Sequence, residues 1–132
     1  MLESVRALAE ALAGEDASVS DLVARLDGRV TDHTGNVIVD EPRLEGIARG
    51  NVVRHRHGED RPANVKLELR EPLELEPLAE RLGEPATVYP DHGGASVQLV
   101  YPRPLVEQPH PVTLIAQSAA GEPAGSIVLR RD

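Results

Sequence analysis

Two histidines at strand spacing are the first side chains in this chain that could do chemistry. His55 and His57 stand in the run Val-Val-Arg-His-Arg-His at positions 52–57. In a β-strand they would point to the same side, about 6–7 Å apart at Cα. Such a pair can bind a metal ion, to which Glu59 or Asp60 could add oxygen. The same pattern is typical of an exposed, basic strand end before a turn. Both interpretations stay open, because two histidines without a third ligand do not define a site.

A second pattern pairs an aspartate with a histidine, in Asp32-His33 and again in Asp91-His92. A carboxylate that orients an imidazole is the arrangement used in general-base catalysis. Asp, His and Gly are also common turn formers, and a repeated turn would keep these residues in both copies. The turn interpretation is favoured. No phosphate-binding loop, nucleophile motif or zinc-helix motif occurs elsewhere, so we expect no catalytic residue and no cofactor.

The charged residues separate along the chain. The segment 43–57 carries four arginines against one acid, and 68–80 carries five acids against one arginine: Arg43, Arg49, Arg54, Arg56 against Glu45, and Glu68, Glu71, Glu74, Glu76, Glu80 against Arg70. Such separation can steer a partner or a second copy of the chain. The alternative is a solvated surface whose charges pair locally. Arg54, Arg56 and Tyr101 are the candidate binding residues, because Arg and Tyr are enriched among interface anchors.

Composition excludes several classes of function. The chain has 132 residues and a net charge of −8, with 40% hydrophobic and 27% charged residues and no cysteine. Disulfides and thiol chemistry are therefore excluded. The negative charge opposes nucleic-acid binding, because phosphates would be repelled. Without a basic leader or a stretch of about 18 apolar residues, we expect a cytoplasmic protein with no membrane segment.

Helical spacing of apolar residues predicts three helices. The first uses Leu2, Val5, Leu8 and Leu12 and stops near Gly14. The second begins after Ser18, a good N-cap, and closes near Gly28. The third runs from about Pro77 to Gly83.

Elsewhere the apolar period is two, as in Val37 and Val39, or Ile127 and Leu129. Turn residues divide these stretches into about eight strands. Several prolines, Pro102, Pro104, Pro109 and Pro111, mark edges or strand ends, since proline cannot donate to a sheet.

The two halves of the chain align with one another. The helix 21–26 matches 77–82, the turn 32–35 matches 91–94, and Pro42-Arg43 matches Pro102-Arg103. We interpret this as an imperfect tandem duplication. The expected fold is α+β, with about eight antiparallel strands from two helix–hairpin–hairpin repeats and helices on one face. One domain spans 1–132, with an extra helix at 1–14 and repeats at about 18–70 and 74–131.

The helix ending in Leu82-Gly83-Glu84-Pro85, followed by antiparallel strands, resembles the β-barrel assembly lipoprotein fold. Two such units in tandem resemble the β-lactamase inhibitory proteins. The resemblance implies a non-enzymatic module that presents a sheet surface to another protein. This chain departs from those families in having no lipobox, no disulfide and no aromatic-rich face.

The first functional hypothesis is thus a non-enzymatic protein-binding or accessory module, of inhibitor or immunity type, acting on a protein partner or as a homodimer. One alternative is a small enzyme or ligand-binding subunit with a pocket between the repeats, built from His55, His57 or His92 and a carboxylate. Another is a structural subunit that only assembles with itself.

Overall fold

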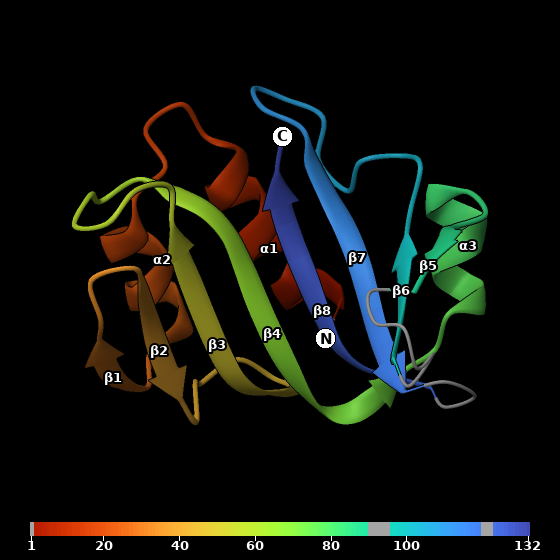
Figure 1. Cartoon of the computed structure of the whole chain (residues 1–132), viewed down its shortest axis with the longest axis horizontal. Coiled ribbons are helices and arrows are strands. Elements are labelled where there is room, and N and C mark those ends of the chain that lie inside the picture. Colours follow the sequence, from red (N-terminus) through yellow and green to blue (C-terminus); the bar gives the residue numbers. More distant parts are fainter. Residues whose placement is uncertain (1, 90–95, 120–122) are drawn as a thin grey trace.

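The computed structural model describes residues 2–89, 96–119 and 123–132. Its strands form one eight-stranded antiparallel sheet in the order β1-β2-β3-β4-β8-β7-β6-β5. The helices lie on one face of this sheet (Figure 1). In chain order the elements are α1 (Leu2–Ala13), α2 (Val19–Leu26), β1 (Arg29–Asp32), β2 (Asn36–Asp40), β3 (Ile47–Arg54), β4 (Pro62–Leu73), α3 (Glu76–Leu82), β5 (Ala86–Val88), β6 (Ser96–Val100), β7 (Val112–Ala119) and β8 (Ala124–Arg131). The expected α+β class is confirmed.

The sheet is symmetric in its order of elements. The first half, Val19–Leu73, is a helix followed by β1 to β4, and the second half, Glu76–Arg131, is a helix followed by β5 to β8. The last strands of the two halves, β4 and β8, pair at the centre of the sheet, which we call the seam. The two outermost strands are therefore β1 and β5. That this order arose by duplication stays a prediction.

One backbone contact recurs in both halves. The N–H of Arg43 donates to the carbonyl of Leu26 at 2.9 Å, and the N–H of Arg103 donates to the carbonyl of Leu82 at 3.0 Å. Each carbonyl belongs to the last residue of a helix, where it has no partner within that helix. Pro42-Arg43 and Pro102-Arg103 thus occupy equivalent places, because each brings the chain back to the end of the preceding helix. The matched turns at 91–94 lie outside the described residues.

The ends of α2 follow from its sequence, with one difference. Ser18 Oγ accepts the backbone N–H of Asp21, which confirms the expected N-cap. At the other end the left-handed residue is Asp27, at φ 52°, rather than glycine. Gly28 is needed for a different reason, because a Cβ there would lie 2.4 Å from the carbonyl oxygen of Asp40.

The core lies between the helices and the sheet and is almost entirely aliphatic. Val37, Val39, Ile127 and Leu129 are at most 3% exposed, as the period of two predicts. Side chains from all three helices complete the same cluster. The prolines between β6 and β7 lie outside the strands, at the sheet end where they were expected. No helix of the described residues is long and apolar enough to cross a membrane.

Candidate functional site

The two candidate metal ligands do not share a strand face. Strand β3 ends at Arg54, so His55 and His57 lie in the turn to β4. A Cβ at Gly35 would lie 3.3 Å from His57 Nε2, which places that imidazole against the β1–β2 turn. His55 instead lines a cavity with His110. The assumed strand geometry is therefore wrong, and no group of three metal-binding side chains is found among the residues that the structure describes.

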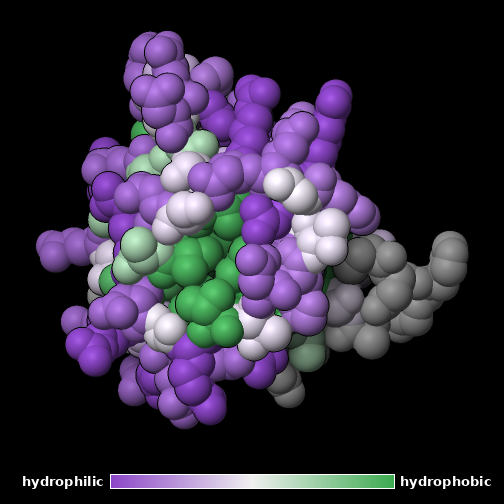
Figure 2. Space-filling view, turned by 90° about the vertical axis from the view of Figure 1, so that its left-hand side faces the viewer, coloured by the Kyte–Doolittle hydropathy of each residue, from purple (hydrophilic) through white to green (hydrophobic). Residues whose placement is uncertain are grey.

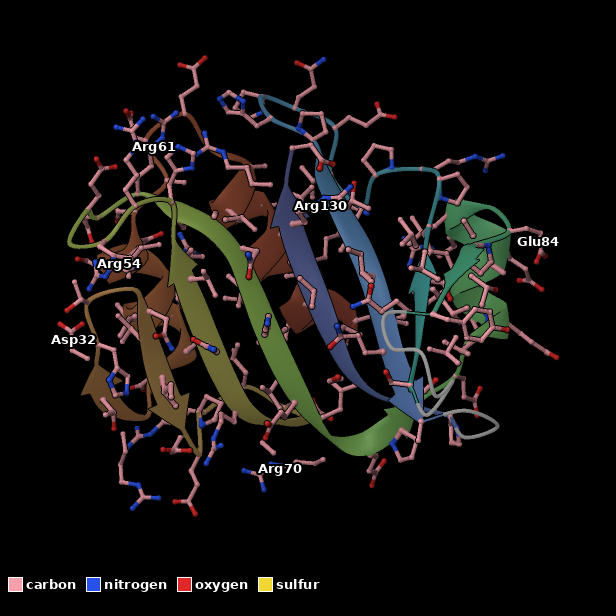
Figure 3. All side chains as sticks on the ribbon, viewed as in Figure 1. Asp32, Arg54, Arg61, Arg70, Glu84 and Arg130 are labelled. Atoms are coloured by element: carbon pink, nitrogen blue, oxygen red, sulfur yellow. The ribbon has the colours of Figure 1, made fainter. Side chains whose placement is uncertain are left out.

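Arg54 is a structural link rather than an exposed anchor. Its side chain is 11% exposed and pairs with Asp32 at 3.0 Å. A second nitrogen donates to the carbonyl of Glu59 at 2.7 Å. Asp32 and Arg54 lie next to one another on the side of the molecule that carries β1 (Figure 3). This pair ties the β1–β2 turn to the β3–β4 turn, whereas Arg56 is exposed, as a binding residue would be.

Tyr101 lies in the core and is 1% exposed. Its ring therefore contributes to packing and cannot act as a surface anchor in this conformation, which corrects the expectation from residue type. Burial, followed by the charge of Glu84, raises the pKa of the Tyr101 hydroxyl above its usual value. That hydroxyl has no hydrogen-bond partner in the described residues.

The first Asp-His pair behaves as a turn. The carboxylate of Asp32 binds Arg54, and the backbone N–H of His33 donates to Asn36 across the β1–β2 turn at 2.9 Å. This geometry agrees with the turn interpretation and does not show the carboxylate–imidazole contact that general-base chemistry needs. Asp91 and His92 lie outside the described residues.

Most of the basic segment pairs locally. Arg43, Arg49 and Arg54 each contact an aspartate of the first half: Asp27 at 3.7 Å, Asp40 at 2.6 Å and Asp32 at 3.0 Å. The hydrogen bond to Asp40 and its charge, then the charge of Glu68, raise the pKa of Arg49. The expected separation of basic and acidic surfaces is weakened by this pairing.

The face of the sheet away from the helices, which we call the open face, carries a row of charges in the first half. Side chains directly opposite one another in neighbouring strands share a face. The charged row runs through four strands in register as Arg29, Asp40, Arg49 and Glu68. Its signs alternate, so each charge stands beside an opposite one. In the second half the same row continues with uncharged side chains: Ser126, Gln117, Gln98 and Val88.

A second row crosses the middle of the open face. In the first half this central row consists of Thr31, Ile38, Asn51 and Lys66. In the second half it consists of Val128, Ile115, Val100 and Ala86, all apolar. Val128 and Ile115 lie outside the core cluster and are each 8% exposed. The central row of the open face therefore changes at the seam from mostly polar to apolar.

A hollow of about 190 Å³ lies where these two surfaces meet. Arg49, Asn51 and Lys66 line it from the first half, and Gln117 and Ser126 line it from the second half. Charged groups and amide groups thus surround a depression at the centre of the sheet. An approaching side chain would find both donors and acceptors there.

A larger cavity of about 310 Å³, the seam cavity, opens at one end of the seam. The first half contributes His55, Arg61, Pro62 and Ala63, and the second half contributes His110, Arg131 and Asp132. Arg61 and Arg130 both lie toward this end of the molecule (Figure 3). A pocket between the repeats with histidine and carboxylate was an alternative expectation. The sequence pointed to His55 for it but gave no signal for His110, which stands in an irregular loop.

A third surface lies at the edge formed by β1. Figure 2 shows this side of the molecule, where hydrophobic atoms form the floor of a recess bordered by hydrophilic side chains. Val30 on β1 is 53% exposed. It pairs in register with the buried Val39, so its side chain points to the helix side of the sheet. The core is thus incompletely covered at this edge.

Comparisons with protein-family models, curated proteins and solved structures find no match for this chain.

Proposed function

We propose that this chain is a non-enzymatic protein-binding module that acts through the open face of its sheet. The observation that carries the proposal is the composition of that face. A row of alternating charges in the first half adjoins an apolar row in the second half. Protein interfaces combine an apolar centre with polar groups that fix orientation, and this face offers both.

The size of the open face suits such a role. Seven interstrand spacings of about 4.8 Å make the sheet about 34 Å wide, and five strand residues extend about 17 Å. The projected area is on the order of 550 Å², comparable with the roughly 800 Å² that each partner buries in a stable complex. In Figure 1 the helices lie behind the sheet, so they leave this face uncovered. The resemblance to the β-lactamase inhibitory proteins implies the same mode of action.

The experiment is a quantitative capture of partners from native lysate with matched variants. Lys66→Glu alters the central row of the first half, and Gln98→Arg alters the second half. Arg25→Glu, on the exposed side of α2, changes the net charge as much as Lys66→Glu does and serves as the control. Each variant is first checked for an unchanged melting temperature.

The wild type and the control should retain one stoichiometric protein, and both open-face variants should lose it. Retention by Lys66→Glu and Gln98→Arg alike, with loss by Arg25→Glu, would place binding on the helix side and overturn the proposal. The absence of any stoichiometric partner would also count against it.

A further inference from the structure

The seam cavity is built from segments that are held in place by backbone contacts. The N–H of His55 donates to the carbonyl of Arg61 at 2.7 Å, which closes the β3–β4 turn. The N–H of His110 donates to the carbonyl of Ala13 at 3.1 Å, and that of Asp132 donates to Pro111 at 2.9 Å. The side chains that line the cavity therefore project from anchored backbone. Binding then has to order only the side chains and not the backbone, which costs less entropy.

The side-chain carboxylate of Asp132, which belongs to the lining, is already engaged. Asp132 Oδ1 accepts from Arg130 Nε at 2.7 Å, and Oδ2 accepts from the hydroxyl of Thr113. Both partners belong to the open-face side of β8 and β7. The negative charge of Asp132 is thus balanced by Arg130, outside the cavity lining.

The donors in the lining are not engaged in the same way. No hydrogen bond or ion pair holds the side chains of His55, Arg61 or His110 in the described part of the chain. Arg131 adds a fourth positively charged or donor-bearing side chain, of which one nitrogen donates to the carbonyl of Gly14 at 3.1 Å. Two guanidinium groups and two imidazoles therefore line one cavity in a chain whose net charge is −8. An anion with several acceptor oxygens could accept hydrogen bonds from these donors.

We propose that the seam cavity binds a small phosphomonoester. A phosphoryl group offers three peripheral oxygens and up to two negative charges, which matches two guanidinium groups flanked by imidazoles better than a monoanionic carboxylate does. Pro62 and Ala63 form the apolar part of the wall, against which the organic part of the ligand would lie. A volume of about 310 Å³ exceeds the needs of inorganic phosphate and lies in the range of small-molecule sites. This binding is independent of the open-face function.

The test uses phenyl phosphate as the probe and benzoate as the carboxylate comparison, at constant ionic strength. Titration of the intact protein is followed by the NMR signals of the histidine side chains. We expect saturable shifts at His55 and His110 with phenyl phosphate and weaker binding of benzoate. Arg61→Gln should raise the Kd by about tenfold or more, because a charge-assisted hydrogen bond is lost.

The matched control is Arg103→Gln, which removes an exposed arginine from the β6–β7 loop that also carries His110 and leaves the cavity lining intact. It should leave the Kd unchanged. His110→Gln provides a second lining variant should Arg61→Gln alter the melting temperature. Equal loss in Arg103→Gln and Arg61→Gln, equal affinity for benzoate, or no saturable shift at either histidine would each overturn the assignment.

Discussion

The first and second halves of the molecule follow the same path but are held together differently. In the first half, α2 has the Ser18 cap, and its first residues bond to Asp60 in the β3–β4 turn: Val19 N to the carbonyl at 2.8 Å and Ser20 Oγ to Oδ1 at 2.8 Å. In the second half, α3 has no side-chain cap and begins with Glu76 and Pro77. Both halves share the backbone hydrogen bond from an arginine to the last residue of the helix. They differ in the contacts that stabilise the start of the helix.

The open faces differ in the same manner. The register pairs charged side chains with one another in β1 to β4, whereas uncharged side chains continue the same row through β5 to β8. Side chains that point to the core are constrained by packing in both halves. Side chains on the open face are not constrained by core packing and can differ between the halves. A partner that binds this face would contact the side chains that differ. The comparison thus separates the residues that build the fold from those available for binding.

The largest expected difference between the halves is in the matched helix-end leucines. Leu26 is fully buried and Leu82 is 6% exposed, and a Cβ at Gly50 would lie 2.8 Å from Leu26 Cδ1. Leu26→Ala should therefore lower the free energy of unfolding by about 3–4 kcal/mol, and Leu82→Ala by about 2–3 kcal/mol. Urea unfolding measures both. A greater loss of unfolding free energy in Leu82→Ala than in Leu26→Ala would mean that the second half, and not the first, is the better packed.

The glycines that follow the two helices should rank next. A Cβ at Gly28 would lie 2.4 Å from backbone oxygen, whereas one at Gly83 would lie 2.8 Å from the side chain of Pro102. Gly83 also has φ of +86°, which an L-residue rarely adopts. We expect Gly28→Ala to cost about 2–3 kcal/mol and Gly83→Ala about 1–2 kcal/mol. Chemical denaturation at one pH gives the order, and equal costs would mean that the backbone at Gly28 shifts freely.

The N-cap gives a smaller effect that is confined to the first half. Ser18→Ala removes the hydroxyl that accepts the Asp21 N–H and should cost about 1 kcal/mol. Asp21→Ala removes the exposed pair with Arg25 and a carboxylate from the first turn of α2. Because alanine has the higher helix propensity, the change should cost no more than about 0.5 kcal/mol. Thermal melting compares the two variants. If both variants lost the same stability, the hydrogen bond of the Ser18 cap would contribute no more than the surface interactions of Asp21.

The smallest effect at neutral pH is expected at Tyr101, in the second half. Tyr101→Phe removes a buried hydroxyl that has no partner in the described residues, so stability at pH 7 should change by less than about 1 kcal/mol. The folded state raises the pKa of this hydroxyl above its usual value of 10.0. It therefore holds the proton more tightly than the unfolded state, and stability is lost as the pH rises above 10. Urea unfolding from pH 8 to pH 11 should show a smaller alkaline loss in Tyr101→Phe than in the wild type; equal losses would refute this origin.

Local patterns predicted the fold because backbone and core constraints act over a few residues. Ser18, Val37 and Leu129 take the places that helix capping and a period of two require. The candidate sites were harder to predict. His55 lies past the end of β3, the Arg54 side chain forms an ion pair with Asp32, and Tyr101 faces the core. Each of these placements depends on where the strands end and how they pair. His110 reaches the seam cavity through the pairing of β8 with both β4 and β7, which no local sequence pattern indicates.

The central claim is that a partner binds the open face, and hydroxyl-radical footprinting of the complex tests it most directly. Ile38, Lys66 and Val100 report on the open face, while Arg81 and Leu105, beside the groove between α1 and α3, report on the helix side. We predict that the captured partner lowers the oxidation of the first set and leaves the second set unchanged. Protection of Arg81 and Leu105 with an unprotected open face would contradict the account.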